Sequence, residues 1–131
     1  MYNPTIVDHY QNPRNMKEMK NATAMGTGSS RTCGDSMALF LTLDKNVIKS
    51  ASFTTIGCSA AIAGGSIITE LLKGKTIDEA QKISPATLIE ALGGVPTIKL
   101  QCVDLVVEAL KSALNNFEKN SRKKPTKSPH P

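Results

Sequence analysis

Tryptophan is absent from this chain of 131 residues, and aromatic residues make up only 4% of it. There is also no continuous apolar run of the roughly 20 residues that a membrane-spanning helix needs, so we expect no membrane span. The scarcity of aromatic side chains argues against a surface that binds nucleic acid. The N-terminus lacks the basic start and the apolar core of a secretory signal. We therefore expect a cytoplasmic protein with neither a membrane nor a nucleic acid as partner.

Sequence motifs for phosphate binding and for nucleophilic catalysis are missing as well. Neither GxGxxG nor GxxxxGK[ST] occurs, and no helical pattern follows the glycine-rich stretch GTGSS at 26–30. Neither His9 nor His130 has a cysteine partner in the sequence, so a Cys–His dyad has no support. We expect His9 to be an ordinary surface or packing residue, and the protein not to be an enzyme.

The net charge of +5 is confined to the C-terminal segment 119–131. This segment has no acidic residue, whereas residues 1–118 carry as many acidic as basic side chains. It also contains three prolines and little that could be buried, which predicts a disordered tail after one domain spanning 1–118. A solvated tail is the simplest interpretation, and electrostatic docking to an acidic partner is the alternative.

Periodicity and turn residues predict strands in the first half of the chain and helices in the second. The helix expected first, at 2–11, ends before Asn12-Pro13, because the residue before proline avoids the helical region. Strands are expected near 24–28 and at 37–43 and 47–55, and helices at 59–72, 76–82, 84–92 and 103–117. Thr76 with Glu79, and Ser84 with Pro85, are helix-start signals. This order predicts an α+β fold: a small antiparallel sheet of about three strands with helices packed on one face.

The three cysteines, Cys33, Cys58 and Cys102, all fall at the predicted ends of elements. No two of them form a CxxC pair, which excludes a zinc ribbon and a thioredoxin-type redox pair. Cys58 and Cys102 lie at or near predicted helix N-termini, which favour the thiolate. Gly34 and Gly57 adjoin two of the cysteines and permit close approach of the backbone. Convergence on a ligand and burial as small apolar residues both remain open at this stage.

Asp35 extends this set of candidate ligands. Residues i and i+2 of a strand point to the same side, so Cys33 and Asp35 would face together. Three thiolates and one carboxylate make four ligands. The alternative is an aspartate that forms hydrogen bonds within a turn.

Five stretches of the sequence form a distinctive combination: CGDSM, FTTIGCSAAIAGGS, LLKGKTIDEA, the K-x-x-C of Lys99–Cys102 and the N-terminal IVDHYQNPRN. Together they resemble the IscU/NifU-type iron–sulfur cluster assembly scaffold. The resemblance covers about residues 2–117. It implies a SufE/NifU-like α+β fold that assembles a [2Fe-2S] cluster from iron and from sulfur delivered by a cysteine desulfurase. It also implies transfer of the cluster to acceptor apo-proteins, and a homodimer in which two clusters couple into [4Fe-4S].

The resemblance assigns roles to individual residues. Cys33, Asp35, Cys58 and Cys102 fall on the cluster-binding positions. Cys102 also falls on the persulfide acceptor, with Lys99 near the site. A single oxygen ligand among sulfurs should make the cluster more labile, as a scaffold requires.

The sequence departs from the family pattern at several positions. Gln101 stands where bacterial members usually have histidine, which leaves Asp35 as the fourth ligand. The sequence VPTIK at 95–99 interrupts the chaperone-recognition motif, which weakens the expectation of an Hsp70-type chaperone partner. Gly64-Gly65 stands where the family usually has serines. Two explanations are open: tight packing of the helix, or the close approach of a partner. Arg31 replaces a more frequent proline, and its role is not predicted.

A zinc-bound persulfide relay of the same fold is the alternative function, because three Cys and one Asp can hold Zn²⁺ tetrahedrally. Zinc is also expected to enter the cluster-free form of a scaffold, so zinc binding alone does not separate the two functions.

Overall fold

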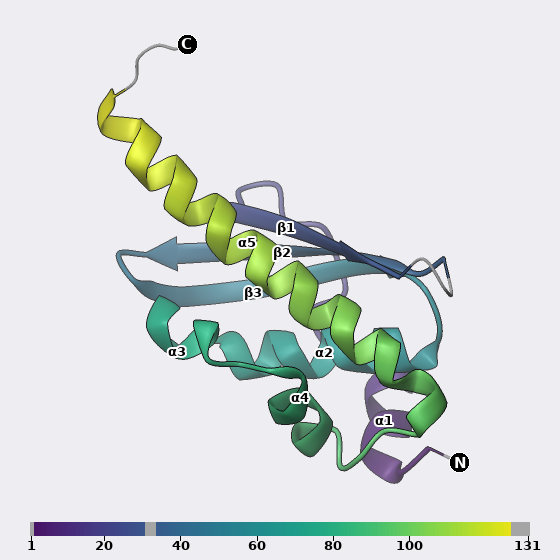
Figure 1. Ribbon diagram of the computed structural model, residues 1–131. Coiled ribbons are helices and arrows are strands. Elements are labelled where there is room, and N and C mark those ends of the chain that lie inside the picture. The colour runs from purple at the N-terminus through teal and green to yellow at the C-terminus, as the bar shows by residue number, and fades with distance from the viewer. Residues whose placement is uncertain (1, 31–33, 127–131) are drawn as a thin grey trace.

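A three-stranded antiparallel sheet forms one layer of the molecule, and helices pack against it (Figure 1). The computed structural model describes residues 2–30 and 34–126, with residues 119–126 as backbone alone. The elements in chain order are α1 (Pro4–Gln11), β1 (Ala24–Ser29), β2 (Ser36–Asp44), β3 (Val47–Ile56), α2 (Ser59–Leu72), α3 (Ile77–Gln81), α4 (Pro85–Ala91), a 3-10 turn (Thr97–Lys99) and α5 (Leu100–Thr126). The strand order is β1-β2-β3, which confirms the predicted α+β architecture.

The hydrophobic core lies between the sheet and the helices α2 and α5. Met37, Leu39 and Leu41 of β2 are buried, and the residues between them are only half-buried, as expected for alternating strand side chains. Each fully buried large aliphatic side chain contributes roughly 1.5–3 kcal/mol. The predicted apolar stripe of α5 is buried against this face, through Val103, Val106, Val107, Leu110, Ala113 and Leu114.

The helix-start signals in the sequence act as predicted. Thr76 and Glu79 form a reciprocal capping box, with Glu79 N–H donating to Thr76 Oγ1 over 3.1 Å and Thr76 N–H donating to Glu79 Oε1 over 2.9 Å. Ser84 caps α4, whose first residue is Pro85. These local contacts satisfy backbone N–H groups that no residue within the helix can bond.

The last helix differs from its prediction at both ends. It spans Leu100–Thr126, so Cys102 lies in its first turn and not in a loop before it. Helix α5 continues as far as Thr126, into the segment 119–131 for which the sequence predicts a disordered tail. Four of the residues from 119 to 126 are Lys or Arg, which have good intrinsic helix propensity. The expected disorder of 127–131 falls outside the described residues. Despite the length of α5, no described helix is both long and apolar enough to cross a membrane.

Helix α5 lies unusually close to β1 because two glycines of that strand have no side chain. A Cβ on Gly26 would stand 2.1 Å from the backbone nitrogen of Ala113, and a Cβ on Gly28 would stand 2.1 Å from the carbonyl oxygen of Leu105. The stretch GTGSS therefore serves helix–strand packing.

Side chains of α5 also bond to the free edge of β1. Ser29 N–H donates to Glu108 Oε1 over 3.3 Å, and Thr27 N–H donates to Ser112 Oγ over 3.2 Å. Asn116 Nδ2 donates to the carbonyl oxygen of Met25 over 2.7 Å. The three α5 residues are spaced four apart and meet every second residue of the strand, so they occupy backbone groups that another strand could otherwise bond.

The adjacent glycines in α2 are explained by packing. A Cβ on Gly65 would stand 2.5 Å from the ring of Phe53, and one on Gly64 would stand 3.0 Å from Val106 Cγ2. Both residues are buried between the sheet and α5. Of the two explanations that the sequence allows, tight packing of the helix accounts for the pair without a second molecule.

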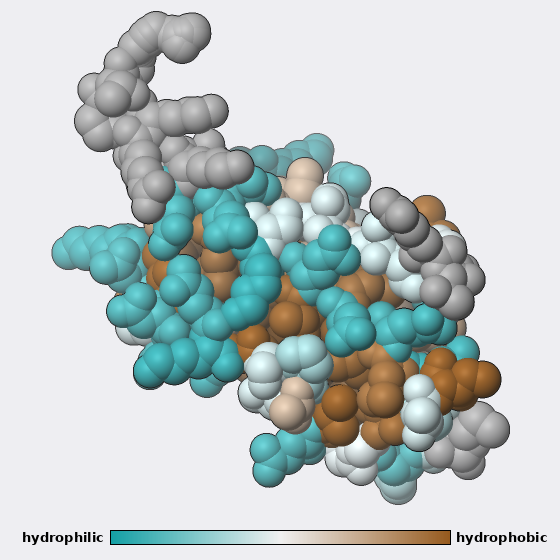
Figure 2. All heavy atoms as spheres, in the orientation of Figure 1, coloured by the Kyte–Doolittle hydropathy of each residue, from teal (hydrophilic) through white to brown (hydrophobic). Residues whose placement is uncertain are grey.

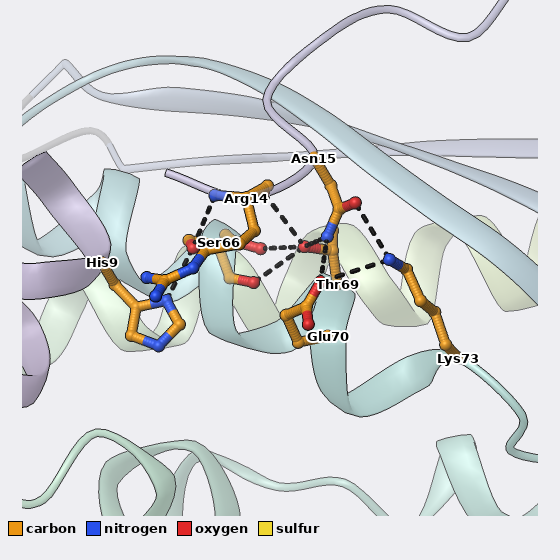
Figure 3. A network of polar contacts seen from close by, with 8 residues as sticks. His9, Arg14, Asn15, Ser66, Thr69, Glu70 and Lys73 are labelled. Atoms are coloured by element: carbon orange, nitrogen blue, oxygen red, sulfur yellow. Dashed lines mark hydrogen bonds and ion pairs between the residues drawn. The ribbon is translucent and has the colours of Figure 1, made fainter. Parts of the chain in front are cut away.

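A network of polar contacts joins α1 and the loop after it to α2 (Figure 3). His9 Nδ1 lies 2.7 Å from the buried Ser66 Oγ, which also accepts from the backbone N–H of Arg14 over 3.0 Å. Asn15 Nδ2 donates to Glu70 Oε2 over 2.7 Å. His9 therefore has a structural role in packing, which is one of the two roles expected for it.

Candidate metal centre

Three candidate ligands from three separate elements converge at one end of the sheet. Asp35 directly precedes β2, Cys58 follows β3 as the N-cap of α2, and Cys102 lies in the first turn of α5. One ligand atom from each lies within 4.8 Å of the others. We refer to Asp35, Cys58 and Cys102 as the metal centre.

Asp35 is positioned by the backbone at the start of α2 and by the glycine that precedes it in the chain. Its carboxylate Oδ2 accepts from the N–H of Cys58 over 3.4 Å, and its side chain is 8% exposed. A Cβ on Gly57 would stand 3.0 Å from the carboxyl carbon of Asp35, so glycine at 57 permits the close approach. A Cβ on Gly34 would have no neighbour within 4 Å, but the φ of +72° at this residue favours glycine.

The loop that carries Asp35 is closed at its base. Gly34 N–H donates to the carbonyl oxygen of Ser30 over 2.8 Å, and Ser30 N–H donates to that of Asp35 over 2.9 Å. Cys33, the remaining predicted ligand, and Arg31 belong to this loop but lie outside the described residues. The base of the loop nevertheless fixes where the chain enters and leaves it, directly beside the metal centre.

The two described thiols lie close to one another without being bonded. Their sulfur atoms are 3.2 Å apart, compared with about 2.05 Å in a disulfide, and both cysteines are free. Cys102 is fully buried and its sulfur lies 3.8 Å from Asp35 Oδ2, whereas Cys58 is half-buried. Cys58 caps α2 through its backbone, with no side-chain hydrogen bond to the helix, so its sulfur is directed to its partners in the centre.

Tyr2 and Lys99 belong to the same end of the molecule. Burial raises the pKa of the Tyr2 phenol, the Lys99 ammonium opposes this shift, and the thiols of Cys58 and Cys102 add to it. These long-range effects place the phenol in the electrostatic field of the metal centre. Sequence reasoning missed Tyr2, because nothing in the pattern around residue 2 indicates an electrostatic interaction with Cys58, Lys99 and Cys102, which lie far along the chain.

Apolar side chains surround this end of the protein. Figure 2 shows them gathered where α1, α4 and the start of α5 meet in Figure 1. Ile98 of the 3-10 turn is 74% exposed and Leu100, the first residue of α5, is 38% exposed. Gln101, beside Cys102, is half-buried.

The donor set fits a thiophilic metal. Thiolate sulfur favours iron–sulfur clusters and zinc, and a carboxylate oxygen can complete either set. The fold and this donor set together define an α+β domain that gathers thiol and carboxylate ligands at one end. The chain belongs to the family of NifU-like N-terminal domains, whose model matches residues 1–124.

The relatives of the chain carry consistent descriptions. An iron–sulfur cluster assembly scaffold protein IscU of Archaeoglobus fulgidus is 43% identical over 123 residues, which cover 93% of this chain and 80% of the relative. The IscU scaffold protein of Buchnera aphidicola is 37% identical, with 90% of this chain and 95% of the relative covered. The predicted resemblance is therefore confirmed. Members of this scaffold family are generally non-catalytic, which confirms the prediction that the protein is not an enzyme.

Solved structures agree on the fold. A putative iron–sulfur cluster assembly scaffold protein for the SUF system, from Fervidobacterium islandicum, has a TM-score of 0.72 at 22% identity, with 86% of this chain and 96% of the other covered. The N-terminal part of a NifU-like protein from Brucella abortus also has a TM-score of 0.72, at 14% identity, covering 92% and 94%. At these identities the likeness concerns the architecture alone.

Proposed function

We propose that this protein is a scaffold on which an iron–sulfur cluster is assembled before transfer to acceptor apo-proteins. The observation that carries the proposal is the convergence of Asp35, Cys58 and Cys102 within 4.8 Å in a member of this family. The similarity to named cluster assembly scaffolds supports it. The cluster is cargo in this account, and the cluster type we propose is [2Fe-2S], with coupling to [4Fe-4S] in a homodimer.

The proposed ligands are Cys33, Asp35, Cys58 and Cys102. Thiolates are the usual ligands of iron–sulfur clusters. Asp35 supplies the one oxygen, since position 101 carries glutamine and not histidine. Gly57 supports the site by leaving room for the Asp35 carboxyl group, and Gly34 supports it by adopting a positive φ directly before Asp35. Lys99 and Gln101 lie beside Cys102 in the chain.

The proposed sulfur source is a cysteine desulfurase. Its persulfide would pass the terminal sulfur to the Cys102 thiolate, leaving a thiolate on the desulfurase and a persulfide on Cys102. Cys102 is fully buried, so this transfer requires local opening at this end of the protein. The exposed Ile98 and Leu100 offer an apolar surface there for a partner.

The interrupted motif at 95–99 still weakens the expectation of an Hsp70-type chaperone. A cytoplasmic location is our proposal for this chain, although one relative from Debaryomyces hansenii is described as mitochondrial.

A zinc-bound persulfide relay is the second candidate function, because the same donor set suits tetrahedral Zn²⁺. Anaerobic reconstitution with iron, cysteine and a desulfurase separates the two. The scaffold account expects visible absorption from a bound cluster, followed by its transfer to an apo-ferredoxin. If no cluster forms while the zinc-loaded protein accelerates desulfurase turnover, the relay account replaces it.

A further inference from the structure

Asn3 joins the N-terminus of α1 to the loop that follows α4. Its Oδ1 accepts from Ile6 N–H over 3.0 Å and thereby caps α1. Its Nδ2 donates to two carbonyl oxygens about 90 positions along the chain, that of Leu92 over 2.9 Å and that of Gly94 over 3.0 Å. We call the last two hydrogen bonds the Asn3 bridge. The amide therefore uses both its acceptor and its donors.

The loop that receives the bridge is shaped for it. The C-cap of α4, Leu92, is followed by two successive glycines with positive φ, +79° at Gly93 and +103° at Gly94. A Cβ on Gly93 would stand only 3.2 Å from Asn3 Nδ2. Carbonyl groups at the end of a helix have no intrahelical donor. Asn3 supplies a donor to one of them, that of the C-cap Leu92, and a second donor to the loop carbonyl of Gly94.

The chain beyond this loop leads directly to the metal centre. Gly94 precedes the 3-10 turn that contains Lys99, and Cys102 follows in the first turn of α5. On the other side of the bridge, Asn3 adjoins Tyr2, whose phenol is influenced by Lys99 and by both described thiols. The Asn3 side chain therefore links two segments that border the site, the start of α1 and the loop that leads to α5.

We propose that Asn3 is a positioning residue for the cluster site, which fixes the segment carrying Lys99 and Cys102 against the N-terminal helix. This inference rests on the proposed function. The bridge restrains the segment before any metal binds, so the thiol of Cys102 is held at its ligand position in advance. Residues that orient metal ligands from outside the coordination sphere typically change metal affinity about 10–100-fold when replaced.

Asn3→Asp isolates the bridge from the cap. Aspartate caps a helix as well as asparagine does, but it cannot donate to the carbonyl oxygens of Leu92 and Gly94. The matched control is Asn12→Asp, the same exchange at the other end of α1, where the side chain bonds to Asp8. The added negative charge near the site would favour a cation, so charge alone cannot explain a lower zinc affinity.

Two measurements on the full chain test the inference. In the metal-free protein, amide hydrogen exchange in peptides covering 93–101 should become about tenfold faster in Asn3→Asp, with α1 unchanged. Zn²⁺ affinity, measured by competition with a chromophoric chelator, should fall about tenfold in Asn3→Asp and stay unchanged in Asn12→Asp.

Equal zinc affinity in Asn3→Asp and wild type would overturn the positioning role, even if hydrogen exchange changes. An equal loss of affinity in both variants would overturn it too, because a general weakening of α1 would then suffice. Both results leave the proposed function intact. That function fails on a different observation, namely that the wild-type protein itself acquires no cluster on reconstitution.

Discussion

Asp35 is the one oxygen donor in the metal centre, and the protein restrains it closely. Its Oδ2 accepts from the N–H of Cys58 at the start of α2, and Gly57 leaves room for its carboxyl group. A carboxylate binds the thiophilic iron of a cluster less tightly than a thiolate does. In our account Asp35 is the ligand that makes the assembled cluster easy to release.

Asp35→Ala should therefore slow the loss of the cluster, which lengthens the half-life of the bound cluster. The half-life is followed as the decay of visible absorption after adding an iron chelator to the reconstituted protein. Asp78→Ala, at an exposed carboxylate in α3, should leave the half-life unchanged. Faster loss from Asp35→Ala than from wild type would count against this role.

His9 makes the stability of the fold sensitive to pH. Burial lowers its pKa below the ordinary 6.5, and the Arg14 guanidinium lowers it further, against opposing effects of Asp8 and Glu70. The unfolded chain then binds a proton more readily than the folded one. The free energy of unfolding should fall as the pH drops below about 6.5, and the loss should end once the lower folded-state pKa is passed.

Thermal unfolding of wild type and His9→Asn between pH 7.5 and 5 checks this prediction. Asparagine places an amide near the position of Nδ1, so the contact with Ser66 can persist without a titratable group. The variant should lose less stability across this range than wild type does. His130 is common to both chains and cancels from the comparison. The same pH dependence in both proteins would contradict the assignment.

At the residue scale, the sequence predicted the convergence of the candidate ligands better than their surroundings. Asp35, Cys58 and Cys102 could be singled out because motifs and element ends are local features of the sequence, and the structure brings these three together. Their role as ligands stays a prediction. The roles of Asn3 and Tyr2 could not be predicted. The two carbonyl groups that Asn3 bonds lie about 90 residues away in the chain, and no periodicity encodes such a contact.

At the scale of elements, the close packing of α5 on β1 depends on missing side chains. Gly26→Ala would bring a methyl group to 2.1 Å from the Ala113 backbone, so the helix must shift away from the strand. We expect a loss of about 3 kcal/mol in the free energy of unfolding. Gly74→Ala is the control, because a Cβ there has no neighbour within 4 Å and only the φ of +85° opposes it, at about 1 kcal/mol.

Chemical denaturation of both variants measures the two losses. If Gly26→Ala were no more destabilising than Gly74→Ala, the close approach of α5 to β1 would be wrong.

The elements themselves were largely predictable, and their limits show where local rules fail. Capping residues and apolar spacing placed α2, α3 and α4 to within one or two residues. The end of α5 was missed, because the apolar spacing stops at Phe117 whereas the helix continues to Thr126. The packing function of Gly26 and Gly28 was also missed, because it depends on Ala113 and Leu105 of a helix that lies 87 and 77 residues later in the chain.

At the scale of the whole molecule, backbone groups on both edge strands of the sheet form hydrogen bonds to residues outside the sheet. Side chains of α5 bond to β1, and on the other edge Phe53 N–H donates to the carbonyl oxygen of Asn15 over 2.9 Å. Ile48 N–H donates to the carbonyl oxygen of Lys75 over 2.8 Å. The end that holds the metal centre carries the exposed Ile98 beside it in the chain, and we propose this end as the surface that partners bind.

The most direct test of the account is the iron and acid-labile sulfide bound per chain after anaerobic reconstitution. Wild type should retain both in equal amounts, and Cys58→Ala, Cys102→Ala and Cys33→Ala should each lose most of them. The contradicting result is a wild-type protein that retains neither, or Cys58→Ala and Cys102→Ala proteins that hold as much iron and sulfide as wild type.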